Sequence, residues 1–271
     1  MNARNAAGAV QQSATAFVLR RDADGIATLT MNRGDRLNPL SSDMLSALQG
    51  ELERIAADGS VRVVVLAGAG KHFCAGHDLR EMRAHLDKAW QSELFEQCSR
   101  MMLSLARLPQ PVIARVQGVA VAAGCQLVSM CDLAVASEVA QFALPGIKSG
   151  LFCTTPGVGV SRNVSRKHAM EMLLTGDLID ARTAERWGLV NRVVPPEKLD
   201  EEIAMLARKI ASYSPAVVQL GKQSFYEQVE ESMSHAYALA SDGMACNMML
   251  EDAAEGIDAF LAKRPPSWKN R

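Results

Sequence analysis

The run V-R-V-V-V-L at residues 61–66 is the feature that most constrains the fold of this chain. A strand with one face in water alternates apolar and polar side chains, whereas this run is apolar almost throughout. Such a strand needs cover on both faces, which a parallel sheet between layers of helices provides. The run therefore predicts an α/β fold with this strand in its interior.

Predicted strands and helices alternate around this run. Short apolar segments predict five further strands, at residues 17–21, 26–31, 112–116, 133–137 and 189–194. Apolar residues recur every three or four positions in three predicted helices, at residues 44–55, 90–105 and 124–130. The first two strands flank D-A-D-G, which favours a hairpin turn at Gly25. Ser41 or Ser42 is the expected cap of the first helix, and Pro109 and Pro111 close the second.

Beyond residue 195 the pattern is helical. We expect a disordered tail at residues 1–16, a core of strand–helix units at 17–195 and a helical C-terminal region at 196–271. The apolar stripes of the last helices could complete the core or bury against neighbouring subunits, and the pattern alone does not separate these uses. Burial between subunits is favoured because the last helices carry more large apolar residues than water tolerates, namely Met244, Met248, Met249, Leu250, Ile257 and Phe260.

Composition excludes several classes of partner. The 29 basic and 30 acidic residues give a net charge of −1, so we expect neither nucleic acid nor an anionic membrane as a partner. The six cysteines form no C-x-x-C pair and lie in apolar runs, which favours buried reduced thiols and no metal site. No apolar run approaches the ~20 residues that cross a membrane. We expect a cytoplasmic protein, with the mitochondrial matrix as the alternative in a eukaryote.

The segment G-V-A-V-A-A-G-C-Q-L-V-S-M-C-D at residues 118–132 is the first candidate for a chemical role. Its small residues follow a predicted strand and enter a helix, so a ligand can approach the backbone closely. The first N–H groups of a helix have no partner within it and carry partial positive charge, which suits a developing oxyanion. The first polar side chain of this helix is Gln126. A neutral amide can position a group but cannot take a proton at neutral pH.

A second candidate segment is K-H-F-C-A-G-H-D-L at residues 71–79. It follows the buried strand and a G-A-G turn, and Asp78 is placed to begin a helix. Ligand sites of α/β folds favour the carboxyl ends of strands, where this turn lies. The alternative is a tight connection that binds nothing.

Together, F-C-A-G-H-D-L and residues 118–137 resemble the crotonase superfamily, the enoyl-CoA hydratase/isomerase family. Four later runs continue the likeness: F-A-L-P-G from Phe142, M-E-M-L-L-T-G-D from Met170, A-E-R-W-G-L-V-N-R-V-V-P from Ala184, and F-L-A-K-R-P-P from Phe260. The run S-G-L-F-C-T-T-P-G-V at 149–158 resembles one branch of this family in particular. The resemblance implies a crotonase-type ββα superhelix whose C-terminal helices form homotrimers, often paired into hexamers.

The resemblance also implies a coenzyme A thioester as the substrate, with no separate cofactor. The backbone N–H groups of His77 and Ala123 match the two that polarise the thioester carbonyl in this family. Their flanking residues are expected to line the same site: Ala75, Gly76, Asp78, Leu79 and Gly124. Residues at the positions that hold the adenosine and phosphates of CoA are Arg36, Leu37, Asn38 and Lys71, with Lys263 reaching the CoA of a neighbouring subunit. A solvated basic face is the alternative for these cations.

The sequence departs from the hydratase pattern at its two catalytic glutamates. Gln126 and Gly146 stand at these positions, and the aspartate typical of the isomerases is also missing. Because each general acid or base contributes about 10²–10⁴-fold, efficient hydration is not expected. The resemblance implies a role in fatty acyl-CoA metabolism, and three alternatives remain for what the protein does there. It is a lyase-type enzyme such as a malonyl-type acyl-CoA decarboxylase; it hydrates or isomerises with displaced groups such as His77, Cys153 or Glu81; or it is a non-catalytic acyl-CoA-binding or assembly protein.

Overall fold

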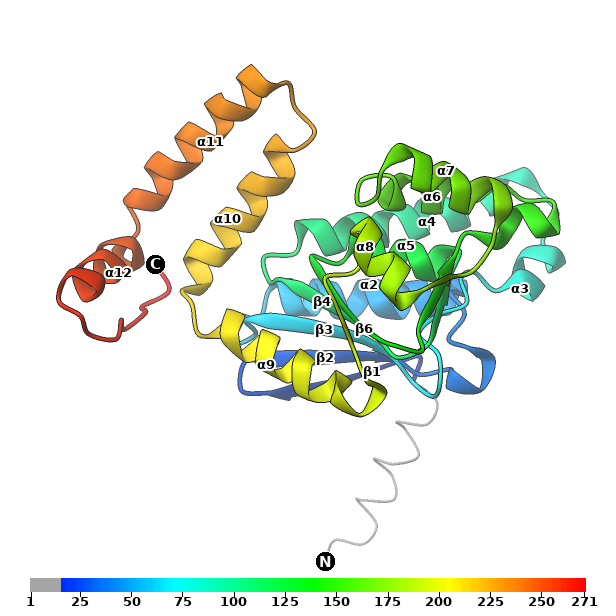
Figure 1. The fold of residues 1–271 in the computed structure, drawn as a ribbon, viewed down its shortest axis with the longest axis horizontal. Helices are drawn as coiled ribbons and strands as arrows, with labels where there is room; N and C mark the ends of the chain where they lie inside the picture. Colours follow the sequence, from blue (N-terminus) through cyan, green and yellow to red (C-terminus); the bar gives the residue numbers. More distant parts are fainter. Residues whose placement is uncertain (1–15) are drawn as a thin grey trace, which may run out of the picture.

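The computed structural model describes residues 16–271, so the expected tail at 1–16 falls almost wholly outside the described residues. A six-stranded sheet in the order β1-β2-β3-β4-β6-β9 forms its centre (Figure 1). Its strands are β1 (Val18–Ala23), β2 (Ile26–Met31), β3 (Val63–Gly68), β4 (Val112–Val116), β6 (Leu133–Ser137) and β9 (Arg192–Val194). Only β1 is antiparallel to its neighbour. The predicted hairpin is confirmed, and Asp24 and Gly25 at its turn both have positive φ.

All six residues of β3 are buried, as its unbroken apolar run predicts. One face of the sheet is covered by α2 (Ser42–Ala56), α4 (Lys88–Arg107) and α5 (Ala123–Met130). Ser41 caps α2 by accepting a hydrogen bond from the Met44 N–H. The other face is covered by α9 (Leu199–Ala211), whose Leu199, Ile203 and Leu206 pack on β3, β4 and β6. The first helix of the expected C-terminal region thus completes the core.

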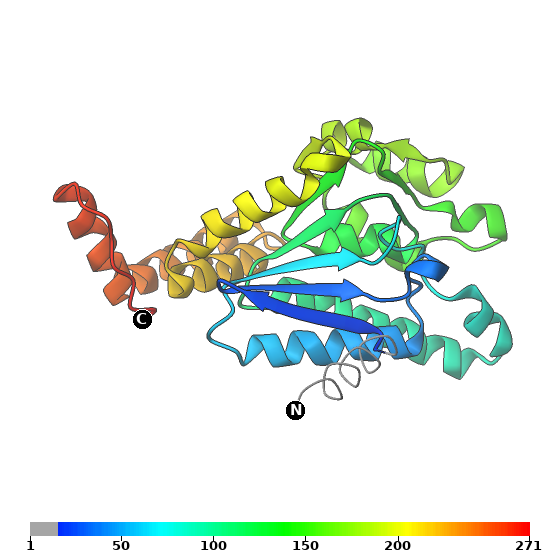
Figure 2. The ribbon, with the colours of Figure 1, turned by 90° about the horizontal axis from the view of Figure 1, so that it is seen from below.

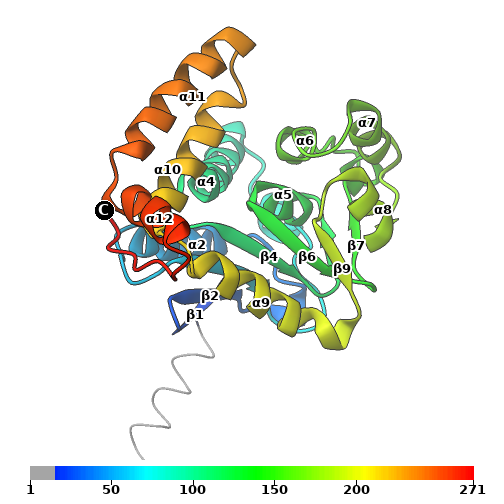
Figure 3. The same cartoon turned by 60° about the vertical axis from the view of Figure 1, so that its left-hand side comes forward.

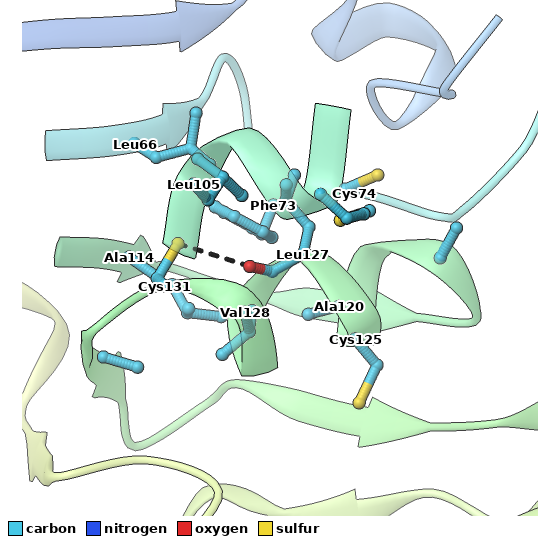
Figure 4. Packing of buried hydrophobic residues seen from close by; sticks show 14 of the residues in the cluster. Leu66, Phe73, Cys74, Leu105, Ala114, Ala120, Cys125, Leu127, Val128 and Cys131 are labelled. Atoms are coloured by element: carbon cyan, nitrogen blue, oxygen red, sulfur yellow. Dashed lines mark hydrogen bonds between the residues drawn. The ribbon is translucent and has the colours of Figure 1, made fainter. Parts of the chain in front are cut away.

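A smaller sheet stands beside the start of α5. It consists of β5 (Val119–Val121), β7 (Gln141–Ala143) and β8 (Ile179–Asp180). The remaining short elements are η1 (Gly34–Arg36), α3 (Leu79–Ala84), η2 (Pro145–Ser149), α6 (Thr154–Val160), α7 (Arg166–Thr175), α8 (Ala181–Trp187) and η3 (Pro196–Lys198). Between the large sheet and α5, Phe73 and Leu127 are buried together with Leu105 of α4 (Figure 4). This packing fixes the loop after β3 against α5.

The last three helices project from the body as an arm (Figures 1 and 2). These are α10 (Pro215–Gln228), α11 (Met233–Met248) and α12 (Glu251–Leu261). The arm leaves apolar side chains in solvent, among them Met244 (61% exposed), Met249 (80%) and Phe260 (81%). Among residues 16–271, no helix is both long and apolar enough to cross a membrane.

A partly buried ion pair joins the arm to the body. The Nζ of Lys222, on α10, lies 2.7 Å from Asp132 Oδ2 and also donates to the carbonyls of Leu105 and Gln110. Tyr226, one turn further along α10, donates its hydroxyl to Asp132 Oδ1 (Figure 3 shows α10 beside α4). Burial lowers the pKa of Lys222, and Asp132 opposes this by favouring the charged amine. The cluster fixes the direction in which α10 leaves the body.

Candidate functional site

The loop after β3 runs alongside β5 and so reaches the start of α5. The N–H groups of Phe73 and Cys74 donate to Val119 O at 3.0 and 3.1 Å, and the Val121 N–H donates to Cys74 O at 3.0 Å. The two segments that the sequence singled out are therefore brought together. Their meeting point is the start of α5, where helical N–H groups are unpaired.

Gly76 lies in contact with the first turn of α5. Its φ is +90°, and a Cβ added to it would lie 2.9 Å from Ala122 Cβ and 3.1 Å from Ala123 N. Ala122 itself has φ 51° and ψ −122°, a conformation that costs a residue with a Cβ about 1–3 kcal/mol. Its N–H donates to Ala143 O, on β7, at 2.9 Å, which helps to hold it there. In the sequence, the only signal for Ala122 is the run of small residues in which it lies.

The two expected oxyanion donors are available. Among the turn, loop and cap hydrogen bonds of residues 16–271, none is donated by the backbone N–H of His77 or of Ala123. His77 follows Gly76 directly, and Gly76 is in contact with Ala123. Two unpaired N–H groups thus lie on neighbouring stretches of backbone, an arrangement suited to stabilising one oxyanion.

The His77 side chain is a poor proton acceptor. Its ring packs edge-on against Phe95 of α4, with centroids 5.4 Å apart. Burial lowers the pKa of His77 to about 4, so the imidazole is neutral at neutral pH. In the part of the chain that the structure describes, its buried Nε2 has no hydrogen-bond partner.

The two acidic residues that follow His77 cap helices. Asp78 accepts hydrogen bonds from the N–H groups of Arg80 and Glu81 and so begins α3. Glu81 accepts from the Ser42 hydroxyl at 2.7 Å and from the Ser42 N–H at 3.0 Å. Leu79, between them, is 58% exposed. Both carboxylates therefore serve helix starts.

Gln126 lies one helical turn beyond Ala123 and is only 5% exposed. Its Oε1 is buried and accepts no hydrogen bond from any described residue. Its backbone is paired normally, since its N–H donates to Ala122 O and its carbonyl accepts from the Ser129 hydroxyl.

Cys153 fills the space beside Gly146. A Cβ at Gly146 would lie 2.8 Å from Cys153 Sγ and 2.8 Å from Leu151 O. The Gly146 N–H donates to the same sulfur at 3.3 Å. Burial raises the pKa of Cys153, so the thiol is protonated at neutral pH. A larger side chain at position 146 has no room in this arrangement.

The expected CoA loop lies next to the loop that carries His77. The Ala75 N–H donates to Leu37 O at 3.0 Å, and Arg36, Leu37 and Lys71 are exposed. Asn38 differs from these exposed residues, because its side chain is fully buried and bonded to backbone. Its Nδ2 donates to three carbonyls, and its Oδ1 accepts from the Arg33 N–H at 2.9 Å. The Asn38 side chain has no free polar atom to offer a nucleotide.

One further residue of the expected site, Lys263, lies apart from this centre. Lys263 is exposed and lies just after α12, and Figure 1 shows α12 and α3 at opposite ends of the molecule. Within one subunit it is therefore separated from Lys71. Among the described residues, no three His, Cys, Asp or Glu side chains are placed to hold a metal ion.

Residues 21–271 match the family model described as enoyl-CoA hydratase/isomerase, and the chain belongs to this family. It is 45% identical over 250 residues to human enoyl-CoA hydratase domain-containing protein 3, mitochondrial. The aligned residues make up 92% of this chain and 82% of the relative. This is the branch that the run at 149–158 indicated.

Two solved structures confirm the crotonase fold. A crystal structure of an enoyl-CoA hydratase from Mycobacterium smegmatis has a TM-score of 0.92 at 54% identity, covering 93% of this chain and 98% of that one. The human domain-containing protein 3 has a TM-score of 0.91 at 44% identity, covering 93% and 100%.

Proposed function

We propose that the protein binds an acyl-CoA thioester and stabilises negative charge on its carbonyl oxygen between the N–H groups of His77 and Ala123. The observation that carries this proposal is the contact of Gly76 with Ala123, which brings two unpaired donors together. Backbone donors in a packed site are already oriented before the charge develops, and removing one such donor typically costs about 10²–10³ in kcat. The strained conformation of Ala122 is the cost of aiming the second donor.

We infer that the reaction needs little proton transfer from the protein. Gln126 cannot exchange a proton, and Gly146 has neither a side chain nor room for one. The displaced groups considered above are poor replacements. His77 has a pKa of about 4, Glu81 caps α2, and the Cys153 thiol has a raised pKa.

Decarboxylation of a malonyl-type acyl-CoA is the second candidate, and the lack of a free carboxylate at Gln126 and Gly146 favours it. Loss of CO₂ leaves the electron pair on the α-carbon and the thioester oxygen, so no base has to remove a proton. The enolate then takes a proton from water at the α-carbon, which gives the shortened acyl-CoA. The oxyanion donors alone then lower the barrier. Without turnover of either class, the protein is an acyl-CoA-binding or assembly protein.

Assembly and compartment belong to the same proposal. We infer a homo-oligomer, a trimer or a dimer of trimers, in which the apolar residues of the arm are buried and Lys263 reaches the CoA of a neighbour. The exposed Arg36 and Lys71 supply the cations for the CoA that is bound to their own subunit. The cytoplasm stays the expected compartment, with the mitochondrial matrix as the alternative because the name of the human relative includes mitochondrial.

The test has two parts: it identifies the reaction products, and it measures turnover after one oxyanion donor is removed. Purified protein is incubated with crotonyl-CoA and, separately, with malonyl-CoA, and the thioesters are identified by mass spectrometry. We expect malonyl-CoA to lose CO₂ faster than crotonyl-CoA gains water. Ala123→Pro removes one donor and should lower turnover about 10²–10³-fold.

Lys88→Pro is the matched control, since it places proline at the first position of α4, whose cap Asp87 has extended backbone. Unchanged turnover in folded Ala123→Pro protein contradicts the oxyanion assignment. Crotonyl-CoA hydration at the rate of an ordinary hydratase contradicts the inference about proton transfer.

A further inference from the structure

Two side-chain amides hold the loop that leads to the oxyanion donors. Asn38 follows β2 and Gln117 follows β4, and these strands are the two neighbours of β3, whose end continues into the loop. Asn38 Nδ2 donates to the carbonyls of Ala69 (2.9 Å), His72 (3.1 Å) and Phe73 (3.0 Å). Gln117 Nε2 donates to the carbonyls of Gly68 (2.6 Å), Gly70 (3.3 Å) and His72 (3.0 Å). We call these two side chains the amide clamp.

The clamp fixes which way the peptide planes of the loop face. In a trans peptide unit the C=O and the following N–H point in opposite directions. The carbonyls of His72 and Phe73 point at the clamp, so the N–H groups of Phe73 and Cys74 point away from it. Both donate to Val119 O of β5. Residues 72–74 are thus bound on one side by the clamp and on the other by β5.

The same strand leads directly to the second donor. Only Ala122 separates β5 from Ala123, and only Ala75 and Gly76 separate Cys74 from His77. The position of residues 72–74 against β5 therefore sets the spacing of the two donor N–H groups. A loop shifted by about 1 Å could cost about 10²-fold in rate, because an oxyanion needs both donors at hydrogen-bond distance.

We propose that Asn38 and Gln117 are positioning residues of the oxyanion site, acting through the loop at 68–73 on the N–H group of His77. This inference rests on the proposed function. Asn38 is not expected to touch the substrate, because it is wholly buried and its amide is bonded to backbone. The partly buried Gln117 acts through its Nε2, which donates to carbonyls of the loop. The two act together because they share the carbonyl of His72.

The variants Asn38→Asp and Gln117→Glu test this role at constant shape. Each replaces an amide donor by an oxygen that cannot donate when ionised and that faces carbonyl oxygens. Asp also tolerates the φ of +50° at position 38. The matched control is Gln110→Glu, because Gln110 is a buried amide that donates to Ile55 O at 3.0 Å, outside the loop.

The readout is the absorption of cinnamoyl-CoA, a conjugated thioester whose band moves to longer wavelength when its carbonyl is polarised. Titration gives the dissociation constant and the shift at saturation separately. We expect a shift with the unmodified protein and with Gln110→Glu. At saturation Asn38→Asp and Gln117→Glu should lose at least about half of it, so weaker CoA binding does not account for the loss. The melting temperatures of all variants are also measured. A clamp variant that is as stable as Gln110→Glu but has lost its absorption shift has not lost it through general destabilisation.

Two results would overturn the inference, and they differ. No shift in the unmodified protein refutes the proposed function and the clamp's role with it. A full shift in both clamp variants refutes the clamp alone and leaves the proposed function in place. If Asn38→Asp does not fold, Asn38→Gly is measured instead, since glycine accepts the same φ without donating a side-chain hydrogen bond.

Discussion

Gly76→Ala should damage both stability and function, and Ala122→Gly should rescue only the first. The new methyl group would lie 2.9 Å from Ala122 Cβ, well inside the 3.5–4.0 Å of an ordinary carbon contact. Overpacking of this kind costs about 1–3 kcal/mol, and an alanine at φ +90° adds about 1–2 kcal/mol. We therefore expect Gly76→Ala to lower the free energy of unfolding by about 2–5 kcal/mol.

Ala122→Gly has the opposite effect on stability. It removes strain of about 1–3 kcal/mol and adds about 0.5–1 kcal/mol of backbone entropy to the unfolded chain. In the double variant the methyl–methyl contact is gone, so the loss should be about 1–3 kcal/mol smaller than the sum of the single effects. Turnover and CoA-thioester binding should not recover, because the methyl group at position 76 still lies 3.1 Å from Ala123 N.

Urea unfolding at matched subunit concentration measures the stability terms, and the product assay measures turnover. Two results would refute the reasoning. One is a Gly76→Ala protein within about 0.5 kcal/mol of the unmodified one. The other is strictly additive single effects, which would show that Gly76 and Ala122 are not in contact.

Three further predictions concern the rest of the molecule. Lys222→Met should lower the free energy of unfolding by about 1–3 kcal/mol, because it leaves the partly buried Asp132 without its cation; a change below about 0.5 kcal/mol in urea unfolding would contradict this. Because the pKa of His77 is lowered in the folded protein, the unfolded chain binds a proton at His77 more readily than the folded protein does. The contribution of His77 to stability is therefore present above pH 6.5 and lost as the pH falls toward 4. Between pH 7.5 and 5 that loss is about 2 kcal/mol, and urea unfolding of His77→Phe should show a pH dependence weaker by this amount. Light scattering at micromolar concentration should show an oligomer, since a monomer would leave Met249 and Phe260 in water.

The sequence predicted most of the core because burial leaves a pattern in it. The run at 61–66, apolar except for Arg62, required cover on both faces, and β3 (Val63–Gly68) has it. Ser41 was one of two candidate caps, and the structure selects it because its hydroxyl meets the Met44 N–H. The position of α9 was open, since its stripe fits the sheet of this chain as well as a neighbouring subunit. Only three-dimensional packing decides between these uses.

The close backbone approaches of the candidate site were predictable, and the long-range contacts that shape it were not. Small residues marked the turns at Gly76 and Ala123 because a close approach excludes side chains. Nothing local reveals that Asn38 and Gln117, far apart in the chain, bind the same carbonyl. Nor does the sequence show that Cys153 occupies the space next to Gly146, so inserting a glutamate there requires the loop to move.

The ion pair of Lys222 and Asp132 has a consequence for the proposed assembly of subunits. The arm leaves the body through a short connection at residues 212–214, which by itself would allow it to swing. Because Lys222 and Tyr226 fix α10 from within the same subunit, the arm has one direction before any partner arrives. Association of subunits then costs their translational and rotational entropy but no additional entropy for ordering a flexible arm. The total entropic cost of association is therefore smaller. The entropy of ordering the arm is lost earlier, when the single subunit folds.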